Sequence, residues 1–151
     1  MWRKLERLGV ARLGDGLVAL PGDARTREQL DWLAEEITEA GGAATVWLAR
    51  PGSAAQEQAI AAAMGAARAG EYRAVIEQAR AAAGSTMTMA ERVRAARRLR
   101  GELRRIARRD FFSLAEREAA KTAVDALAIP VQAGAGQRTP SADVREGPEQ
   151  T

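Results

Sequence analysis

Two chemically versatile residues are missing from this chain of 151 residues, which contains neither cysteine nor histidine. Without cysteine there are no disulfide bonds and no thiol redox chemistry, and cysteine–histidine zinc sites are excluded as well. A serine or cysteine nucleophile activated by histidine is also excluded. Aromatic residues make up only 4% of the sequence, so the core must consist of smaller side chains. We therefore expect a protein that is not an enzyme and that uses no cofactor or metal.

Long hydrophobic runs are also missing from the sequence. The sequence contains no stretch of about 18 apolar residues, which is the length needed to cross a membrane. It also contains no charged segment followed by an apolar one, the pattern of a secretion signal. We expect a cytoplasmic protein that does not bind membranes. Alanine is abundant, with 35 residues, and 46% of the chain is hydrophobic. This composition favours helices with a core of small side chains.

A helix and a β-hairpin are predicted at the start of the chain. Apolar residues recur at helical spacing from Trp2 to Leu8, which predicts a helix over residues 1–9. Apolar runs on either side of residues 14–16 (Gly-Asp-Gly) predict a hairpin that turns at the glycines.

A second helix and a third strand follow in the prediction. Thr26 and Gln29 form a capping box that predicts the start of the helix, and the glycine pair at 41–42 predicts its end. Residues 43–49 (AATVWLA) are short, partly β-branched and bounded by glycine and proline, which predicts a strand. We expect Trp47 of this strand to lie in the core.

Three further helices are predicted in the second half of the chain, each opened by a capping side chain. They cover residues 53–83, 88–109 and 113–128, with caps at Ser53, Thr88 and Ser113. The residues after Pro130 are rich in glycine, proline and charge and have no periodicity, which predicts disorder.

The order of these elements is that of a ferredoxin-like β-α-β-β-α-β unit without its first strand. That strand is central in the fold, so its absence leaves two inner edges with unpaired backbone groups. We predict an α+β fold with an incomplete ferredoxin-like unit over residues 1–52. A helical part over residues 53–129 is expected to pack on it within the same domain, followed by a disordered tail over residues 130–151.

Positive charge is concentrated in one predicted helix. Residues 88–109 carry nine arginines and two glutamates, a net charge of +7, whereas the rest of the chain carries −4, which together give the overall +3. An apolar stripe of Val93, Ala96, Leu99, Leu103 and Ile106 marks one side of this helix. The other side holds eight candidate DNA-binding residues, which are Arg94, Arg97, Arg98, Arg100, Arg104, Arg105, Arg108 and Arg109.

The arginines predict contacts with the phosphates of a nucleic acid, because a row of cations on one face neutralises a phosphate backbone. Two other interpretations stay open. The face is solvated or paired within the chain, particularly with Glu35, Glu36 and Glu39, or it docks on an acidic protein partner. The apolar stripe either packs within the chain or forms the interface of a homodimer. Trp32 is either a partly buried residue on a helix flank or part of a contact surface.

Several short motifs, in their order and spacing, resemble the N-terminal domain of the ChrB family of chromate-resistance proteins. They are residues 2–9 (WRKLERLG), 13–21 (LGDGLVALP), 26–28 (TRE), 39–42 (EAGG) and 110–112 (DFF). The resemblance extends over about residues 2–128. It implies a bacterial regulator that acts on transcription of a chromate-efflux system and responds to chromate. It also implies a fold related to the ferredoxin-like domains of PaaX-type repressors.

Two features of the family are missing from this chain. Longer members carry a second, C-terminal domain; if that domain holds the oxyanion sensor, the chain is expected to bind DNA or a partner without responding to chromate. Members also have a strand and a turn before the equivalent of Trp2, so we expect the native chain to begin upstream of Met1. A regulator that contacts DNA is the function predicted first, and an interaction module for an acidic partner or a separate sensor domain is the alternative. A chromate or sulfate carrier is a weaker prediction, because exposed arginines bind oxyanions loosely.

Overall fold

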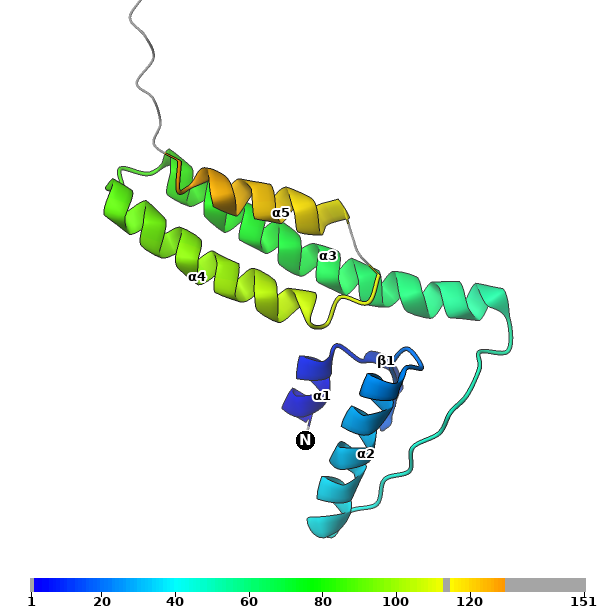
Figure 1. Ribbon diagram of the computed structural model, residues 1–151. Helices are drawn as coiled ribbons and strands as arrows, with labels where there is room; N and C mark the ends of the chain where they lie inside the picture. Colours follow the sequence, from blue (N-terminus) through cyan, green and yellow to red (C-terminus); the bar gives the residue numbers. More distant parts are fainter. Residues whose placement is uncertain (1, 113–114, 130–151) are drawn as a thin grey trace, which may run out of the picture.

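Five helices and one two-stranded sheet form the described part of the chain, residues 2–112 and 115–129, in the computed structural model (Figure 1). The elements are α1 (Trp2–Leu8), β1 (Ala11–Gly14), β2 (Leu17–Ala19), α2 (Ala24–Glu39), α3 (Ala54–Gly84), α4 (Met89–Ala107) and α5 (Ala115–Ala126). Helices α3, α4 and α5 pack on one another, and β1 packs on α3. The predicted α+β class is confirmed, and the ferredoxin-like arrangement stays a prediction.

One apolar stripe from each of three helices builds the core. The fully or almost fully buried members are Tyr72, Val75, Ala79 and Ala82 of α3, Ala96, Leu99 and Ile106 of α4, and Ala120, Val124 and Leu127 at α5 and just after it. They recur at intervals of three, four or seven residues, which keeps them on one side of each helix. The alanines allow close approach of the helices, so the chain builds a core with few aromatic side chains.

The predicted hairpin is present as β1 and β2. The strands pair antiparallel, with Ala11 opposite Ala19 and an irregularity between Arg12 and Gly14. The turn contains Gly16 at a φ of 78°, a backbone conformation that glycine adopts without strain. Ala11 is buried because β1 lies against α3.

Helix α2 begins one turn before its predicted capping box. Its N-cap is Asp23, whose carboxylate accepts a hydrogen bond from the Thr26 backbone N–H at 2.7 Å. The Thr26 hydroxyl accepts in return from the Asp23 N–H at 3.2 Å, so Thr26 is the third residue of the helix rather than its cap. Aspartate caps a helix as well as threonine does, and it takes the earlier position here.

The predicted strand over residues 43–49 is wrong. This segment forms neither strand nor helix and runs between α2 and α3 (Figure 1). Trp47, which was expected in the core, is 79% exposed, and Leu48 is 84% exposed. A strand needs a neighbour for its backbone hydrogen bonds, and β1 and β2 pair only with each other in the described residues. The β propensity of the segment is therefore not sufficient to make it a strand.

The helical half follows the prediction closely. Ser53 and Thr88 cap α3 and α4 as expected, and α3 continues through Gly65 and Gly70. Helix α4 ends at Ala107, two residues before its predicted end. The predicted cap at Ser113 and the predicted tail lie outside the described residues, and the proposed division of the chain at residues 52 and 129 stays a prediction.

Within the described ranges, no helix is long and apolar enough to cross a membrane.

The helical core should dominate stability. We expect Leu99→Ala to lower the free energy of unfolding by about 2–5 kcal/mol, because Leu99 is fully buried and its truncation leaves a cavity. The matched control is Leu48→Ala, which removes the same atoms from an exposed side chain and should change stability by less than about 0.5 kcal/mol. Urea denaturation followed by circular dichroism measures both, and equal effects would contradict the assignment of the core.

Candidate nucleic-acid interface

Helix α4 is stabilised at both ends by local interactions. At the start, Thr88 and Glu91 form a reciprocal capping box, with the Glu91 carboxylate accepting from the Thr88 N–H at 2.7 Å. These hydrogen bonds, mainly the one from the Thr88 backbone, hold the pKa of Glu91 below its usual value. The last turn contains Arg104 and Arg105, whose positive charges suit the negative end of the helix dipole. The basic sequence therefore folds as a regular helix of 19 residues.

The apolar stripe of α4 faces the other two helices of the core. Ala96, Leu99 and Ile106 are buried, and Leu103 packs against the same cluster. The prediction that the stripe packs within the chain is confirmed. A homodimer stays a prediction, and it would need a different surface.

The eight candidate arginines fall into two groups. Arg100 and Arg109 are partly buried and form ion pairs, at 2.8 Å with Asp125 and at 2.7 Å with Glu71. The other six are exposed, and none of them forms an ion pair with another described residue. We call these six the arginine face, and they are Arg94, Arg97, Arg98, Arg104, Arg105 and Arg108.

Ion pairs among the described residues neutralise only two of the eight candidate arginines of α4 and the residues just after it. Glu36 of α2 forms an ion pair with Lys4 of α1 instead of an α4 arginine. Glu35 and Glu39 form no ion pair with a described residue. Within the arginine face, Arg98 donates a hydrogen bond to the Gln78 side-chain oxygen at 3.0 Å, an interaction that leaves its charge uncompensated. Six positive charges therefore remain on one surface.

The geometry of α4 gathers these six charges into a band. At 100° per residue the six positions span an arc of about 120°, centred opposite the buried stripe. From Arg94 to Arg108 the band is about 21 Å long, since an α-helix rises 1.5 Å per residue. A duplex carries one phosphate charge for about every 1.7 Å of its axis when both strands are counted, so several phosphates lie alongside a straight band of this length.

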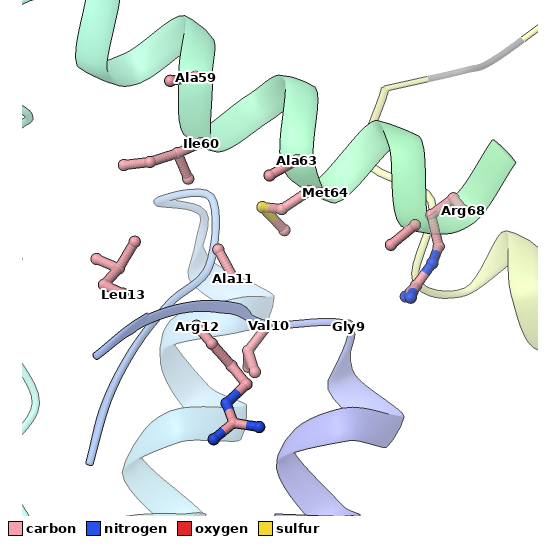
Figure 2. Close-up of a pocket in the computed structure, with 11 residues that line it drawn as sticks. Gly9, Val10, Ala11, Arg12, Leu13, Ala59, Ile60, Ala63, Met64 and Arg68 are labelled. Carbon is pink, nitrogen blue, oxygen red and sulfur yellow. The ribbon is translucent and has the colours of Figure 1, made fainter. Parts of the chain in front are cut away.

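A second group of charged residues lies where Gly9, just after α1, approaches α3 and the residues after α4. Glu71 forms ion pairs with two arginines, with Arg68 Nη2 at 2.9 Å from one oxygen and Arg109 Nη2 at 2.7 Å from the other. Gly9, at a φ of 77°, lies so close that a Cβ there would be 2.8 Å from the Arg109 Cβ. Figure 2 shows the Arg68 side chain reaching from α3 toward Gly9. We call Arg68, Glu71 and Arg109 the junction cluster.

Arg109, one of the eight candidate DNA-binding residues, belongs to the junction cluster in the structure. Helix α4 ends before Arg109, and the Arg109 side chain donates a hydrogen bond to Glu71, 38 residues earlier in the chain. Arg68 and Glu71 were not identified from the sequence at all. Their spacing of three on a helix predicts an ordinary surface ion pair, and nothing local signals that a third residue joins them.

Buried groups beside the junction cluster have shifted pKa values. Tyr72 donates a hydrogen bond to the Asp110 carboxylate at 3.0 Å, and burial together with this bond raises the pKa of Tyr72 to about 12. Burial lowers the pKa of Arg68, and the charge of Arg109 acts in the same direction. Desolvation is the largest cause of both shifts, in agreement with the low exposure of the Tyr72 and Arg68 side chains.

Two tryptophans of the N-terminal part, Trp2 and Trp32, are exposed. Trp32 on α2 is 67% exposed, so it fits a contact surface better than it fits a partly buried residue on a helix flank. Trp2 stacks with the Arg12 guanidinium, whose carbon lies 4.8 Å from the ring centre. In residues 2–112 and 115–129, no cluster of three or more acidic side chains could hold a metal ion.

The ionisation of Tyr72 can be measured directly because it is the only tyrosine in the chain. We expect its phenolate absorbance to appear near pH 12 in the folded protein and near pH 10 in denaturant. The neutral phenol is favoured in the folded state, so its contribution to stability is complete below pH 10 and is lost as the pH rises toward 12. Asp110→Asn should move the folded value toward 10, and a folded wild-type chain that titrates at 10 would contradict the burial of this group.

One comparison with known proteins gives a match. The family model described as "Protein ChrB, N-terminal" matches residues 1–135, a range that contains the arginine face and the junction cluster. No curated protein and no solved structure matches the chain.

Proposed function

Because this chain belongs to the ChrB N-terminal family, we propose that it is a regulator of chromate resistance that contacts DNA through the arginine face of α4. In this proposal the chain acts on transcription and is not an enzyme. The family membership supports the role in regulation. The contact with DNA is argued from the charge and geometry of α4.

The observation that carries the proposal is the set of six exposed arginines opposite a buried stripe. Burial of Ala96, Leu99 and Ile106 holds α4 in one orientation, so the six charges are presented together without a conformational change. Guanidinium groups bind phosphate oxygens with paired N–H donors. Each phosphate that is neutralised releases counterions, which favours binding at low salt.

The arginine face is suited to affinity rather than to base recognition. Phosphate contacts orient a protein on a duplex but carry no sequence information by themselves. Any preference for an operator must therefore come from other residues or from the shape of the DNA. Arg100 and Arg109 are left out of the proposed contact surface because their charges are already paired.

The test is DNA binding by fluorescence anisotropy, with DNA from upstream of the protein's own gene and shuffled DNA of equal length. If six phosphates are neutralised, the slope of log K against log salt should be about −5 between 50 and 200 mM salt. Replacing Arg94, Arg97, Arg104 and Arg105 with glutamine should reduce the slope to about −2, because four contacts are lost.

A matched control replaces Arg25, Arg27, Arg50 and Arg80 with glutamine. These four are also exposed, but none lies on α4, so the same change in net charge should leave most of the salt dependence in place. Equal loss in both variants would show that only net charge matters and would contradict a specific face. If the wild type does not bind DNA at 50 mM salt but co-purifies with an acidic protein after nuclease treatment, the face is a docking surface for that partner instead.

A further inference from the structure

Helix α2 has an exposed face on the side away from its buried residues. The members of this face recur at intervals of four, three and four residues, and they are Glu28, Trp32, Glu35 and Glu39. At about 100° per residue they span an arc of about 60°, opposite the buried Thr26 and Leu33. The face thus combines three carboxylates with one large aromatic ring. We call these four residues the glutamate face.

The charge of the glutamate face is not compensated within the described part of the chain. None of its three carboxylates forms an ion pair with a described residue. Helices α2 and α4 do not pack on each other, and Figure 1 shows them on separate parts of the molecule. The arginine face of α4 therefore does not neutralise these carboxylates within one copy of the chain.

Helix α4 repeats the spacing of the glutamate face with residues of opposite charge. Arg97, Gly101, Arg104 and Arg108 also recur at intervals of four, three and four, on the side of α4 opposite its buried stripe. Each set is about 16 Å long, since an α-helix rises 1.5 Å per residue. If the two helices align in parallel, each of these three arginines meets one glutamate, and Trp32 meets Gly101.

Gly101 leaves a gap in the side chains of α4 at the position that would meet the tryptophan. Glycine inside a helix is less favourable than alanine. A Cβ at Gly101 would meet no other side chain nearer than Arg104 Nη2, at 3.7 Å, so packing within the chain does not require glycine here. The gap does allow an aromatic ring of another molecule to approach α4 closely, with guanidinium groups beside it that can stack on the ring.

We propose that the glutamate face of one copy of this chain binds the arginine face of a second copy, in a homodimer that makes this contact twice. Opposite charges at matched spacing attract the two helices and set their register. Two-fold symmetry pairs α2 of each copy with α4 of the other. The apolar stripe of α4 stays buried in the core of its own copy, so the dimer needs no rearrangement of the fold.

Self-association and the proposed DNA contact use the same arginines and therefore compete. A duplex offers a denser row of negative charges than three glutamates do, so DNA displaces the partner copy when both are present. The dimer is then a form of the protein in which the arginine face is covered. This consequence rests on the proposed function, but the contact between copies does not. The contact is measured without DNA, so its failure and the failure of DNA binding are separate results.

Sedimentation velocity of the full chain, freed of nucleic acid by nuclease, tests the contact. We expect a dimer at about 50 mM salt and a monomer at about 500 mM, because salt screens exposed charges. Replacing Glu28, Glu35 and Glu39 with lysine should give a monomer at low salt, and so should replacing Arg97, Arg104 and Arg108 with glutamate. A mixture of these two variants should form a dimer again, since each α2 then meets an α4 of opposite charge.

A matched control replaces Asp15, Glu77 and Glu118 with lysine. These three are exposed and lie outside α2, so the same change in net charge should leave the dimer in place at low salt. Equal loss of the dimer in this control and in the lysine variant of the glutamate face would contradict a specific contact.

The aromatic contact is tested by two single substitutions. Gly101→Leu fills the gap on α4 and Trp32→Ala removes the ring, and each should weaken dimerisation by about tenfold. The control is Gly70→Leu, at an exposed glycine of α3 with open space around its Cβ position, which should have no effect. Circular dichroism checks that each variant is folded. The proposal is overturned if the wild type stays monomeric at low salt, if the mixed charge variants do not associate, or if folded Gly101→Leu dimerises as the wild type does.

Discussion

Packing of the α4 apolar stripe against α3 and α5 is the constraint on which the rest of the described structure depends. Leu99 and Ile106 of this stripe are buried, so α4 cannot rotate about its axis without exposing them. This orientation sends the arginines on the opposite side into solvent as one band. It also brings the chain after α4 back toward the middle of α3, where Arg109 reaches Glu71. One hydrophobic contact surface thus sets the position of both charged sites.

The N-terminal part is attached to this helical core by a small set of contacts. Ala11 of β1 lies against α3, and Gly9 fits closely beside Arg68 and Arg109. The N-terminal elements contribute little to the core, since its fully buried cluster comes from α3, α4 and the residues of and just after α5. Side chains of that part such as Trp32 and Trp47 stay exposed. The arginines of the junction cluster therefore lie where Gly9 of the N-terminal part approaches the helical core.

The sequence-based predictions are accurate where an element depends on residues that are close together in the chain, and they fail where it depends on distant ones. Ser53 and Thr88 were identified as caps because a cap bonds to a backbone group three residues away. Residues 43–49 were wrongly predicted as a strand, because a strand depends on a partner that may lie anywhere in the chain. The error at Thr26 was small, since Asp23 offered an equally good cap one turn earlier. Four of the five residues predicted for the apolar stripe of α4 lie in or against the core, and the exception is Val93.

The same difference between local and long-range interactions applies to the candidate sites. The sequence by itself determined that α4 is an amphipathic helix with its arginines opposite an apolar stripe, because helical periodicity relates residues only three and four positions apart. Only the tertiary structure decided which arginines stay free, since Arg100 meets Asp125 and Arg109 meets Glu71 across distances in sequence that no local pattern encodes. It also decided that Arg68 is buried with an N–H that bonds to no described residue, because burial depends on how Gly9, α3 and the end of α4 come together.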